Sequence, residues 1–113
     1  MAVTIYHNPR CSKSRQTLAL IEEKGISPTI VEYLATPPSQ KILKDILAML
    51  GVGPKDIVRK KEAKEAGLDL ASMSDAAVVK AMADNPAVIE RPIVVSGKKA
   101  AMGRPPENVL AIL

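Results

Sequence analysis

A single thiol stands in the segment of the chain that is best suited to chemistry. Cys11 is the only cysteine among 113 residues, and it follows a short apolar segment and precedes what reads as the start of a helix. The positive end of a helix dipole and its unpaired backbone N–H groups favour thiolate, the reactive form of cysteine. Four side chains close in sequence could add to that effect: His7, Arg10, Lys13 and Arg15. We therefore expect Cys11 to be a nucleophile, the alternative being a buried and inert thiol.

The chain has no second cysteine with which Cys11 could form an internal disulfide. Ser14 takes the place of the second cysteine in the C-x-x-C motif of dithiol oxidoreductases. This spacing predicts monothiol chemistry, in which the thiol of another molecule resolves any oxidised or covalent state of Cys11. The Ser14 hydroxyl could donate to the thiolate or to a bound oxyanion, or it could satisfy backbone groups in the first helical turn.

Two residues ahead of Cys11 could support it. His7 could lower the pKa of the thiol as an imidazolium or act as a proton donor, and it could equally be structural. Asn8 could orient His7 or the loop, or provide simple turn chemistry before Pro9. No metal is expected, because one cysteine and one histidine cannot supply the usual zinc ligands. A tyrosine-phosphatase loop is excluded, since C-x5-R would need an arginine where Thr17 stands.

Three arginines occupy distinctive positions away from this loop. Arg59 follows an apolar pair, Arg91 precedes a proline at the start of an apolar run, and Arg104 lies between a glycine and a proline. The planar donor fork of arginine suits tetrahedral oxyanions, so a cluster of arginines beside a thiolate would form an oxyanion site. The alternative for each of them is an ordinary surface position.

Length and composition narrow the class of protein. A chain of 113 residues with 47% hydrophobic residues predicts one soluble domain, over residues 1–113. The net charge of +4 arises from mixed acidic and basic residues, which predicts a solvated mixed surface. The aromatic residues are Tyr6 and Tyr33 alone, which argues against a nucleic-acid partner bound by stacking.

The sequence predicts a cytoplasmic protein that makes no contact with a membrane. It contains no run of about 18 apolar residues and no pattern of a signal peptide. A lone unpaired cysteine agrees with a reducing compartment.

Periodicity and turn signals predict the elements that must position these side chains. We expect strands at 3–6, 29–33, 93–95 and 99–102 and helices at 12–24, 40–50, 75–84 and 106–113, with helical turns at 54–58 and 61–67. This order is that of an α/β thioredoxin-like fold, a mixed four-stranded sheet with an enlarged helical insert before the closing hairpin. In such a fold the ends of the hairpin lie near the first loop, which favours Arg91 and Arg104 as partners of Cys11.

Four stretches give the chain a resemblance to a known family over its full length. They are Ile5 to Leu18 around His7-Asn8-Pro9 and Cys11, Val58-Arg59-Lys60-Lys61, Glu90-Arg91-Pro92-Ile93-Val94-Val95, and Gly103-Arg104-Pro105-Pro106 through Leu113. In this order and spacing they resemble the glutaredoxin-dependent arsenate reductases. The resemblance is greatest to the short, arsenate reductase-like subgroup, which is related to the Spx-type transcription regulators.

The resemblance implies a site and a reaction. Cys11 would attack arsenate with loss of water, while Arg59, Arg91 and Arg104 would hold the arsenic intermediate. Glutathione, a co-substrate, would attack the adduct so that arsenic is reduced, and glutaredoxin would then remove the glutathione, leaving arsenic(III) on Cys11 for hydrolysis. No bound cofactor is implied, and the proline that matches Pro92 is typically cis.

The chain departs from the best-known members of this family in two respects. They have Cys-Gly-Thr-Ser where this chain has Cys11-Ser12-Lys13-Ser14, and they extend well past the residue that matches Leu113. Two other functions stay open. One is an Spx-type adaptor that binds a protein partner, although those regulators often carry a C-x-x-C switch. The other is a monothiol glutaredoxin-like transferase that acts on glutathione mixed disulfides.

Overall fold

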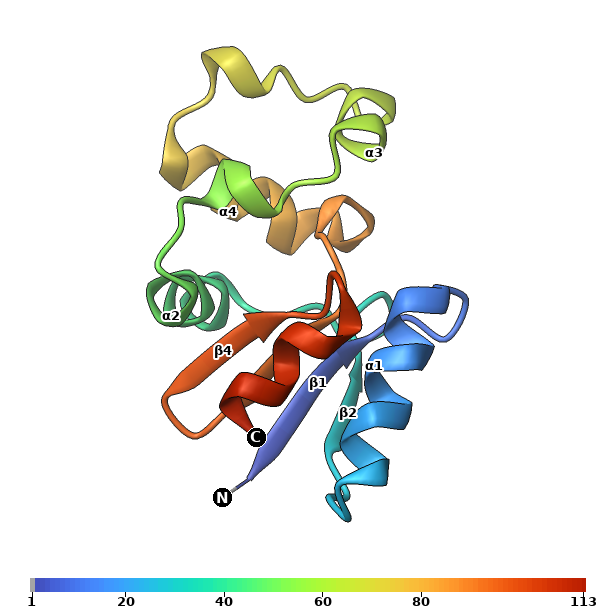
Figure 1. The fold of residues 1–113 in the computed structure, drawn as a ribbon. Coiled ribbons are helices and arrows are strands. Elements are labelled where there is room, and N and C mark those ends of the chain that lie inside the picture. Colours follow the sequence, from blue (N-terminus) through green and yellow to red (C-terminus); the bar gives the residue numbers. More distant parts are fainter. Residues whose placement is uncertain (1) are drawn as a thin grey trace. The chain divides into compact units, whose positions relative to one another are not determined.

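The chain divides into two compact units. The computed structural model describes residues 2–113, of which 2–36 and 91–113 form one unit and Pro37–Glu90 the other. We call them the sheet unit and the helical unit (Figure 1). The single domain over residues 1–113 that the sequence suggests stays a prediction.

The sheet unit contains the mixed four-stranded sheet. Its elements are β1 (Val3–His7), α1 (Ser12–Glu23), β2 (Thr29–Glu32), β3 (Ile93–Ser96), β4 (Lys99–Met102) and the 3-10 helix η4 (Pro106–Ile112). The strand order is β2-β1-β3-β4, with β1 parallel to β2 and antiparallel to β3, and β3 antiparallel to β4. The predicted α/β fold with a mixed sheet is therefore confirmed. The first strand runs one residue further than expected because His7 pairs with Glu32.

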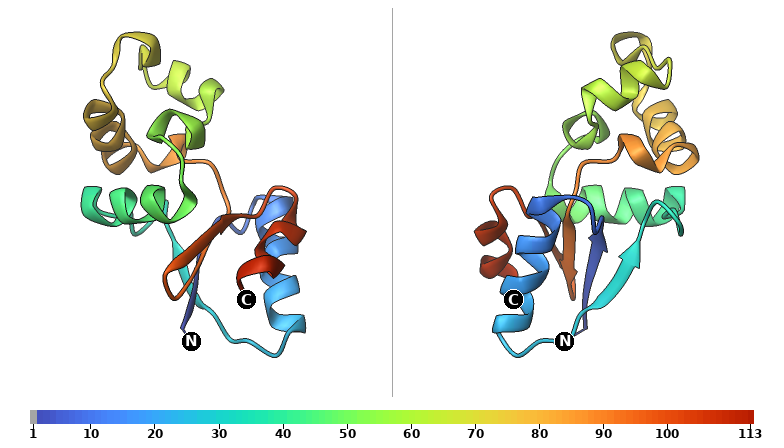
Figure 2. Two further views of the ribbon diagram at one scale, coloured as in Figure 1. Left: turned by 60° about the vertical axis from the view of Figure 1, so that its left-hand side comes forward. Right: turned by 90° about the vertical axis from the view of Figure 1, so that its right-hand side faces the viewer.

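One face of the sheet carries the core of this unit. Ile5 lies opposite Val94, and Val94 lies opposite Ala101, so these side chains share a face. Ile5 and Val94 are fully buried, together with Ile21 of α1 and Val109 of η4. Helices α1 and η4 lie on the same side of the strands (Figure 2). The core is thus aliphatic, as a composition almost without aromatic residues requires.

The last element differs from the sequence-based expectation. The predicted helix over 106–113 is a 3-10 helix, Pro106–Ile112. It begins at Pro106, the second of two consecutive prolines, which have no N–H to donate. Its first turn is closed by the short-range bond from Asn108 N–H to the Pro105 carbonyl oxygen, 3.0 Å. Burial of Val109 anchors this short helix against the sheet.

The helical unit is the predicted insert. Its elements are α2 (Gln40–Leu50), η1 (Pro54–Ile57), α3 (Lys60–Glu65), η2 (Leu70–Ser72), α4 (Asp75–Asp84) and η3 (Pro86–Val88). A serine caps the N-terminus of each of the two longest helices of this unit: Ser39 accepts from Ile42 N–H before α2, and Ser74 accepts from Ala77 N–H before α4. Gly51 ends α2 with a φ of 71°, a left-handed conformation that glycine adopts without strain.

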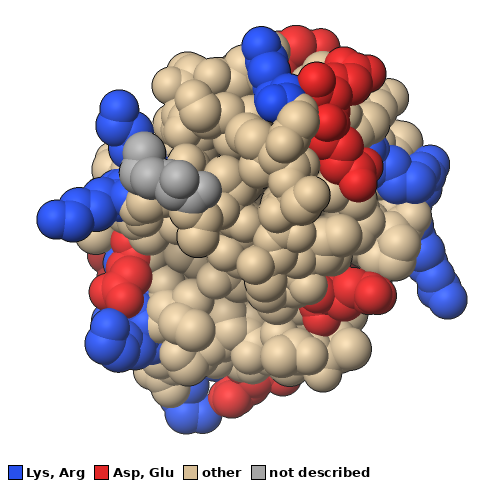
Figure 3. Space-filling view, turned by 90° about the horizontal axis from the view of Figure 1, so that it is seen from below, with Lys and Arg blue, Asp and Glu red and all other residues tan. Residues whose placement is uncertain are grey.

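Two further findings concern membrane-spanning helices and the distribution of surface charge. No helix within residues 2–113 has the length and apolar character needed to cross a membrane. On the face drawn in Figure 3, basic and acidic side chains alternate around an uncharged centre. That face shows the mixed charge expected from the sequence.

Gly103 lies at the tightest approach between segments of the sheet unit. Its N–H donates to the Pro92 carbonyl oxygen at 2.9 Å. A Cβ at this position would overlap the Thr17 hydroxyl oxygen and lie 2.7 Å from Pro92 Cγ. No side chain larger than that of glycine therefore fits at position 103 without displacing Thr17 or Pro92.

The two X–Pro bonds beside this contact are cis. They are Arg91–Pro92, as the resemblance implies, and Arg104–Pro105.

We predict that Gly103→Ala destabilises the protein by about 1–3 kcal/mol, the usual cost of forcing extra volume into a packed site. Thr17 is fully buried and cannot move aside into solvent. The midpoint of urea unfolding measures the effect. Gly53→Ala is the control, because a Cβ there would meet only the Asp56 carboxylate at an ordinary 3.7 Å. Equal shifts in the two variants would contradict the packing argument.

Candidate active site

Cys11 occupies the N-cap of α1, as the sequence predicts. Its backbone is extended, its carbonyl oxygen accepts from Arg15 N–H at 3.0 Å, and its own N–H donates to the Asn8 carbonyl oxygen at 3.0 Å. The Asn8 side chain accepts from Arg10 N–H, 3.0 Å, which forms a tight turn. Asn8 therefore shapes the loop that leads from β1 to the thiol. Cys11 itself is 9% exposed, so the sulfur lies at the edge of the packed interior.

The Ser14 hydroxyl is directed at His7 and the loop backbone. Its oxygen lies 2.6 Å from His7 Nδ1 and accepts from Asn8 N–H at 3.0 Å, and Ser14 is fully buried. Of the two roles considered for this hydroxyl from the sequence, the contact with Asn8 N–H favours that of satisfying a backbone group. The backbone N–H of Ser14 also works to lower the pKa of the Cys11 thiol.

His7 is buried beneath the loop, at the end of β1. Burial lowers its pKa, the charge of Glu32 works to raise it, and Arg15 works to lower it, with a net decrease. The imidazole is therefore mainly neutral at pH 7, since even an unperturbed histidine titrates at about 6.5. A neutral ring bonded to Ser14 favours an effect of His7 through the hydrogen bond over an effect through charge.

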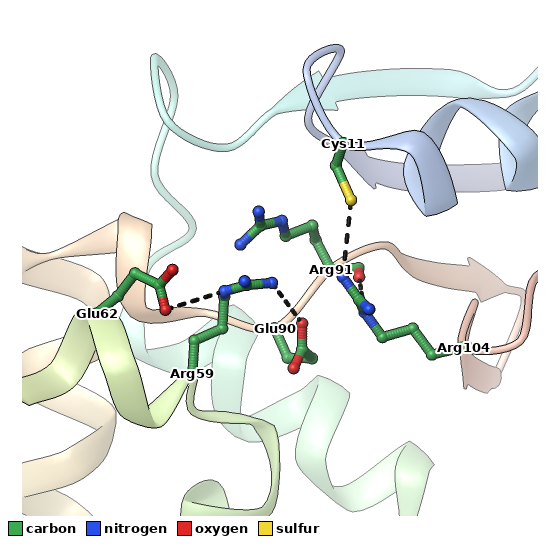
Figure 4. A network of polar contacts seen from close by, with 6 residues as sticks. All are labelled: Cys11, Arg59, Glu62, Glu90, Arg91 and Arg104. Atoms are coloured by element: carbon green, nitrogen blue, oxygen red, sulfur yellow. Dashed lines mark hydrogen bonds and ion pairs between the residues drawn. The ribbon is translucent and has the colours of Figure 1, made fainter.

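Arg104 is the cation whose position beside the thiol is best defined. Its Nη2 lies 3.7 Å from Cys11 Sγ, and its Nε donates to the Arg91 carbonyl oxygen at 2.8 Å (Figure 4). The Arg104 carbonyl oxygen in turn accepts from the Asn108 amide at 3.0 Å. Hydrogen bonds thus fix both the side chain and the backbone carbonyl of Arg104, and the guanidinium is directed at the sulfur. Within the sheet unit, the structure brings Cys11, Arg91 and Arg104 together.

Several groups determine the pKa of the Cys11 thiol. Burial works to raise it, but the backbone N–H groups of Ser14 and Lys13 and the hydrogen bond and charge of Arg91 outweigh burial, so the pKa is lowered. The largest charge effect thus comes from Arg91, and the neighbouring side chains expected from the sequence contribute less. The reason is geometric, because Arg15 extends back to the Pro9 carbonyl oxygen at 2.8 Å.

Arg59 belongs to the helical unit, at the N-cap of α3. Its Nε forms an ion pair with Glu62 at 3.1 Å and its Nη1 another with Glu90 at 3.1 Å (Figure 4). Burial works to lower the pKa of the guanidinium, but the two carboxylates outweigh it and raise the pKa, so Arg59 keeps its charge. A role for Arg59 in holding an oxyanion stays a prediction.

The sequence did not single out Glu62 and Glu90 as members of this cluster. Glu62 carries a local signal, since residues three apart on a helix are neighbours. Glu90 carries none, because its contact with Arg59 joins residues 31 positions apart.

Comparisons with known proteins agree with the resemblance in the motifs. A family model described as "ArsC family" matches residues 6–112. The chain is 51% identical to the Escherichia coli protein YfgD, covering 98% of this chain and 96% of that one. It is 49% identical to a Haemophilus influenzae protein named arsenate reductase, over 100% of both chains.

A solved structure agrees as well. The structure named "Arsenate reductase from Vibrio cholerae" superimposes with a TM-score of 0.94 at 50% sequence identity, over 100% of this chain and 98% of that one. Sequence motifs, fold and full-length similarity lead to one conclusion: the chain belongs to the ArsC family.

Proposed function

We propose that the chain reduces arsenate to arsenite with glutathione and glutaredoxin as thiol donors. The observation that carries the proposal is a thiol of lowered pKa at a helix N-terminus with the Arg104 guanidinium 3.7 Å away. The names of full-length relatives support arsenate as the oxyanion.

In the first step the Cys11 thiolate attacks arsenic, and one oxygen of arsenate takes up protons and leaves as water. The oxygens that remain carry negative charge. The guanidinium groups of Arg91 and Arg104 stabilise that charge, and because Arg104 is already anchored to the Arg91 carbonyl oxygen, little ordering is needed when the anion arrives. Arg59 is the third arginine of the proposal.

External thiols complete the reaction, since the chain has one cysteine. The glutathione sulfur attacks the arsenic bound to Cys11 and displaces a second oxygen, which takes up protons and leaves as water, so that arsenic(V) carries two sulfurs. The glutaredoxin thiolate then attacks the glutathione sulfur, forming a mixed disulfide and leaving two electrons on arsenic, which becomes arsenic(III). Water releases arsenite from Cys11. Such thiols belong to a reducing compartment, in agreement with the predicted cytoplasmic location.

His7, Asn8, Ser14 and Pro92 have supporting roles in this proposal. The bonds of Ser14 to His7 and to Asn8 N–H fix the loop, and Pro92 accepts from Gly103 N–H beside Arg104. These contacts hold the Cys11 thiol and the arginines of the sheet unit in fixed positions relative to one another.

The test is arsenate turnover coupled to glutathione, glutaredoxin and NADPH oxidation. We expect arsenate-dependent NADPH oxidation that Cys11→Ser abolishes, because a hydroxyl is a far poorer nucleophile at neutral pH. Circular dichroism checks that the variant is folded. Phosphate, selenate and a glutathione mixed disulfide are assayed in parallel. Turnover of the mixed disulfide without any turnover of arsenate would favour the transferase function.

A second prediction concerns the thiolate. Titration of its ultraviolet absorbance should give a Cys11 pKa below the usual value of about 8.5. Arg91→Ala should raise that pKa, because removing a positive charge beside the sulfur disfavours the thiolate. Arg10→Ala is the control, since Arg10 is exposed and is expected to change the pKa less. A normal pKa in the unmodified protein, or a larger shift in the control, would contradict this account.

A third prediction concerns oxyanion binding. Alanine at Arg59, Arg91 or Arg104 should lower kcat/KM for arsenate, by about 10- to 100-fold at Arg91 and Arg104, the size of a lost charge-assisted hydrogen bond. Arg104→Lys should restore activity in part, because the ammonium keeps the charge but not the planar fork. Normal turnover and oxyanion affinity in all three alanine variants would refute the arginine site.

A further inference from the structure

Arg59 is already engaged by two carboxylates within the helical unit. Glu62 and Glu90 each approach the guanidinium at 3.1 Å, from different sides of the group. The side chains of Arg59 and Glu62 are 24% exposed and that of Glu90 is 27% exposed, so water screens these charges only in part. The three side chains together carry one net negative charge.

The backbone holds Glu90 against Arg59. An isolated antiparallel bridge pairs Val58 with Ile89. On either side of it, Arg59 N–H donates to the Val88 carbonyl oxygen and Glu90 N–H donates to the Ile57 carbonyl oxygen, each at 2.7 Å. Both bridge residues are buried, which makes the pairing part of the packed interior. The contact between Arg59 and Glu90 is therefore built into the fold of this unit.

The two carboxylates are not equivalent. Glu62 lies on the first turn of α3, three residues after Arg59, so it is a local partner in a favourable position near the helix N-terminus. Glu90 accepts a hydrogen bond from Arg59 Nη1, comes from a distant segment and directly precedes Arg91 in the sequence. Of the two, Glu90 competes more directly with an external anion for the terminal donors of the guanidinium.

We propose that Glu90 determines the affinity of the site for oxyanions, because its carboxylate pairs with Arg59 in place of an oxyanion and so weakens the binding of oxyanions. The inference rests on the proposed function, which gives Arg59 the task of holding the oxyanion. An arriving anion meets a guanidinium that is already neutralised, and it is also repelled by the carboxylate. Glu90 thereby sets the oxyanion concentration at which the site fills.

The test is Glu90→Gln, which keeps the shape and an acceptor oxygen and removes the charge. We expect KM for arsenate to fall by about 3- to 10-fold, in keeping with the loss of one partly screened charge interaction. The KM for glutathione should stay unchanged. Glu65→Gln is the matched control, since Glu65 is an exposed residue of the same helix as Glu62 and its loss changes the net charge equally.

The opposite outcomes overturn the inference. An arsenate KM that rises in Glu90→Gln would show that the carboxylate merely positions Arg59. An arsenate KM that is unchanged, or that falls equally in Glu65→Gln, would show that Glu90 does not compete specifically for the guanidinium.

Equilibrium binding separates this inference from the proposed reaction. Inorganic phosphate and arsenate are titrated calorimetrically into the unmodified protein, Glu90→Gln and Glu65→Gln without any thiol donor. Tighter binding of the anions to Glu90→Gln alone supports the inference even if arsenate is never turned over, an outcome that would refute only the proposed function. Equal affinities in the three proteins, or no binding in any of them, overturn the inference even where turnover is observed.

Discussion

The hydrogen bond from Arg104 Nε to the Arg91 carbonyl oxygen, 2.8 Å, is the contact on which the candidate site depends. It joins the segment after β4 to the segment before β3, and it directs the Arg104 guanidinium at Cys11. Gly103 reinforces it from the next position, because its N–H donates to the Pro92 carbonyl oxygen and its missing side chain leaves room for Thr17. A backbone carbonyl carries no net charge, so this hydrogen bond positions the guanidinium without neutralising it.

The thiol shows how burial and hydrogen bonding oppose each other at one atom. Burial alone would keep Cys11 protonated and inert. Two backbone N–H groups at the start of α1 and the charge of Arg91 reverse that effect. The loop that precedes Cys11 is fixed by Ser14, whose hydroxyl contacts His7 Nδ1 and accepts from Asn8 N–H. A neutral imidazole suits this buried position, since the cost of burying a charged ring exceeds the favourable effect of Glu32.

The arginine of the helical unit has charged partners of its own. Arg59 lies against two carboxylates, while the guanidinium of Arg104 is bonded to a carbonyl oxygen. Two carboxylates reduce the attraction of the Arg59 guanidinium for an external anion, whereas a hydrogen bond to a carbonyl oxygen does not by itself neutralise a guanidinium. Two arginines assigned the same task by a resemblance in sequence therefore differ in these contacts.

The sequence by itself determined the order of strands and helices, the N-caps at Ser39 and Ser74, the helix start at Cys11 and the family. These features depend on residues close in the chain, whose hydrogen bonds and periodicity can be read locally. The sequence alone did not predict the type of the last helix or the relative effect of each cation on the thiol. The final segment forms a 3-10 helix, and Arg91 acts on the thiol more than the neighbouring cations do. Only the tertiary structure decided the partners of the Ser14 hydroxyl, the anchoring of Arg104 and the pairing of Glu90 with Arg59, because those contacts depend on chain segments that meet only after the sheet and the insert have folded.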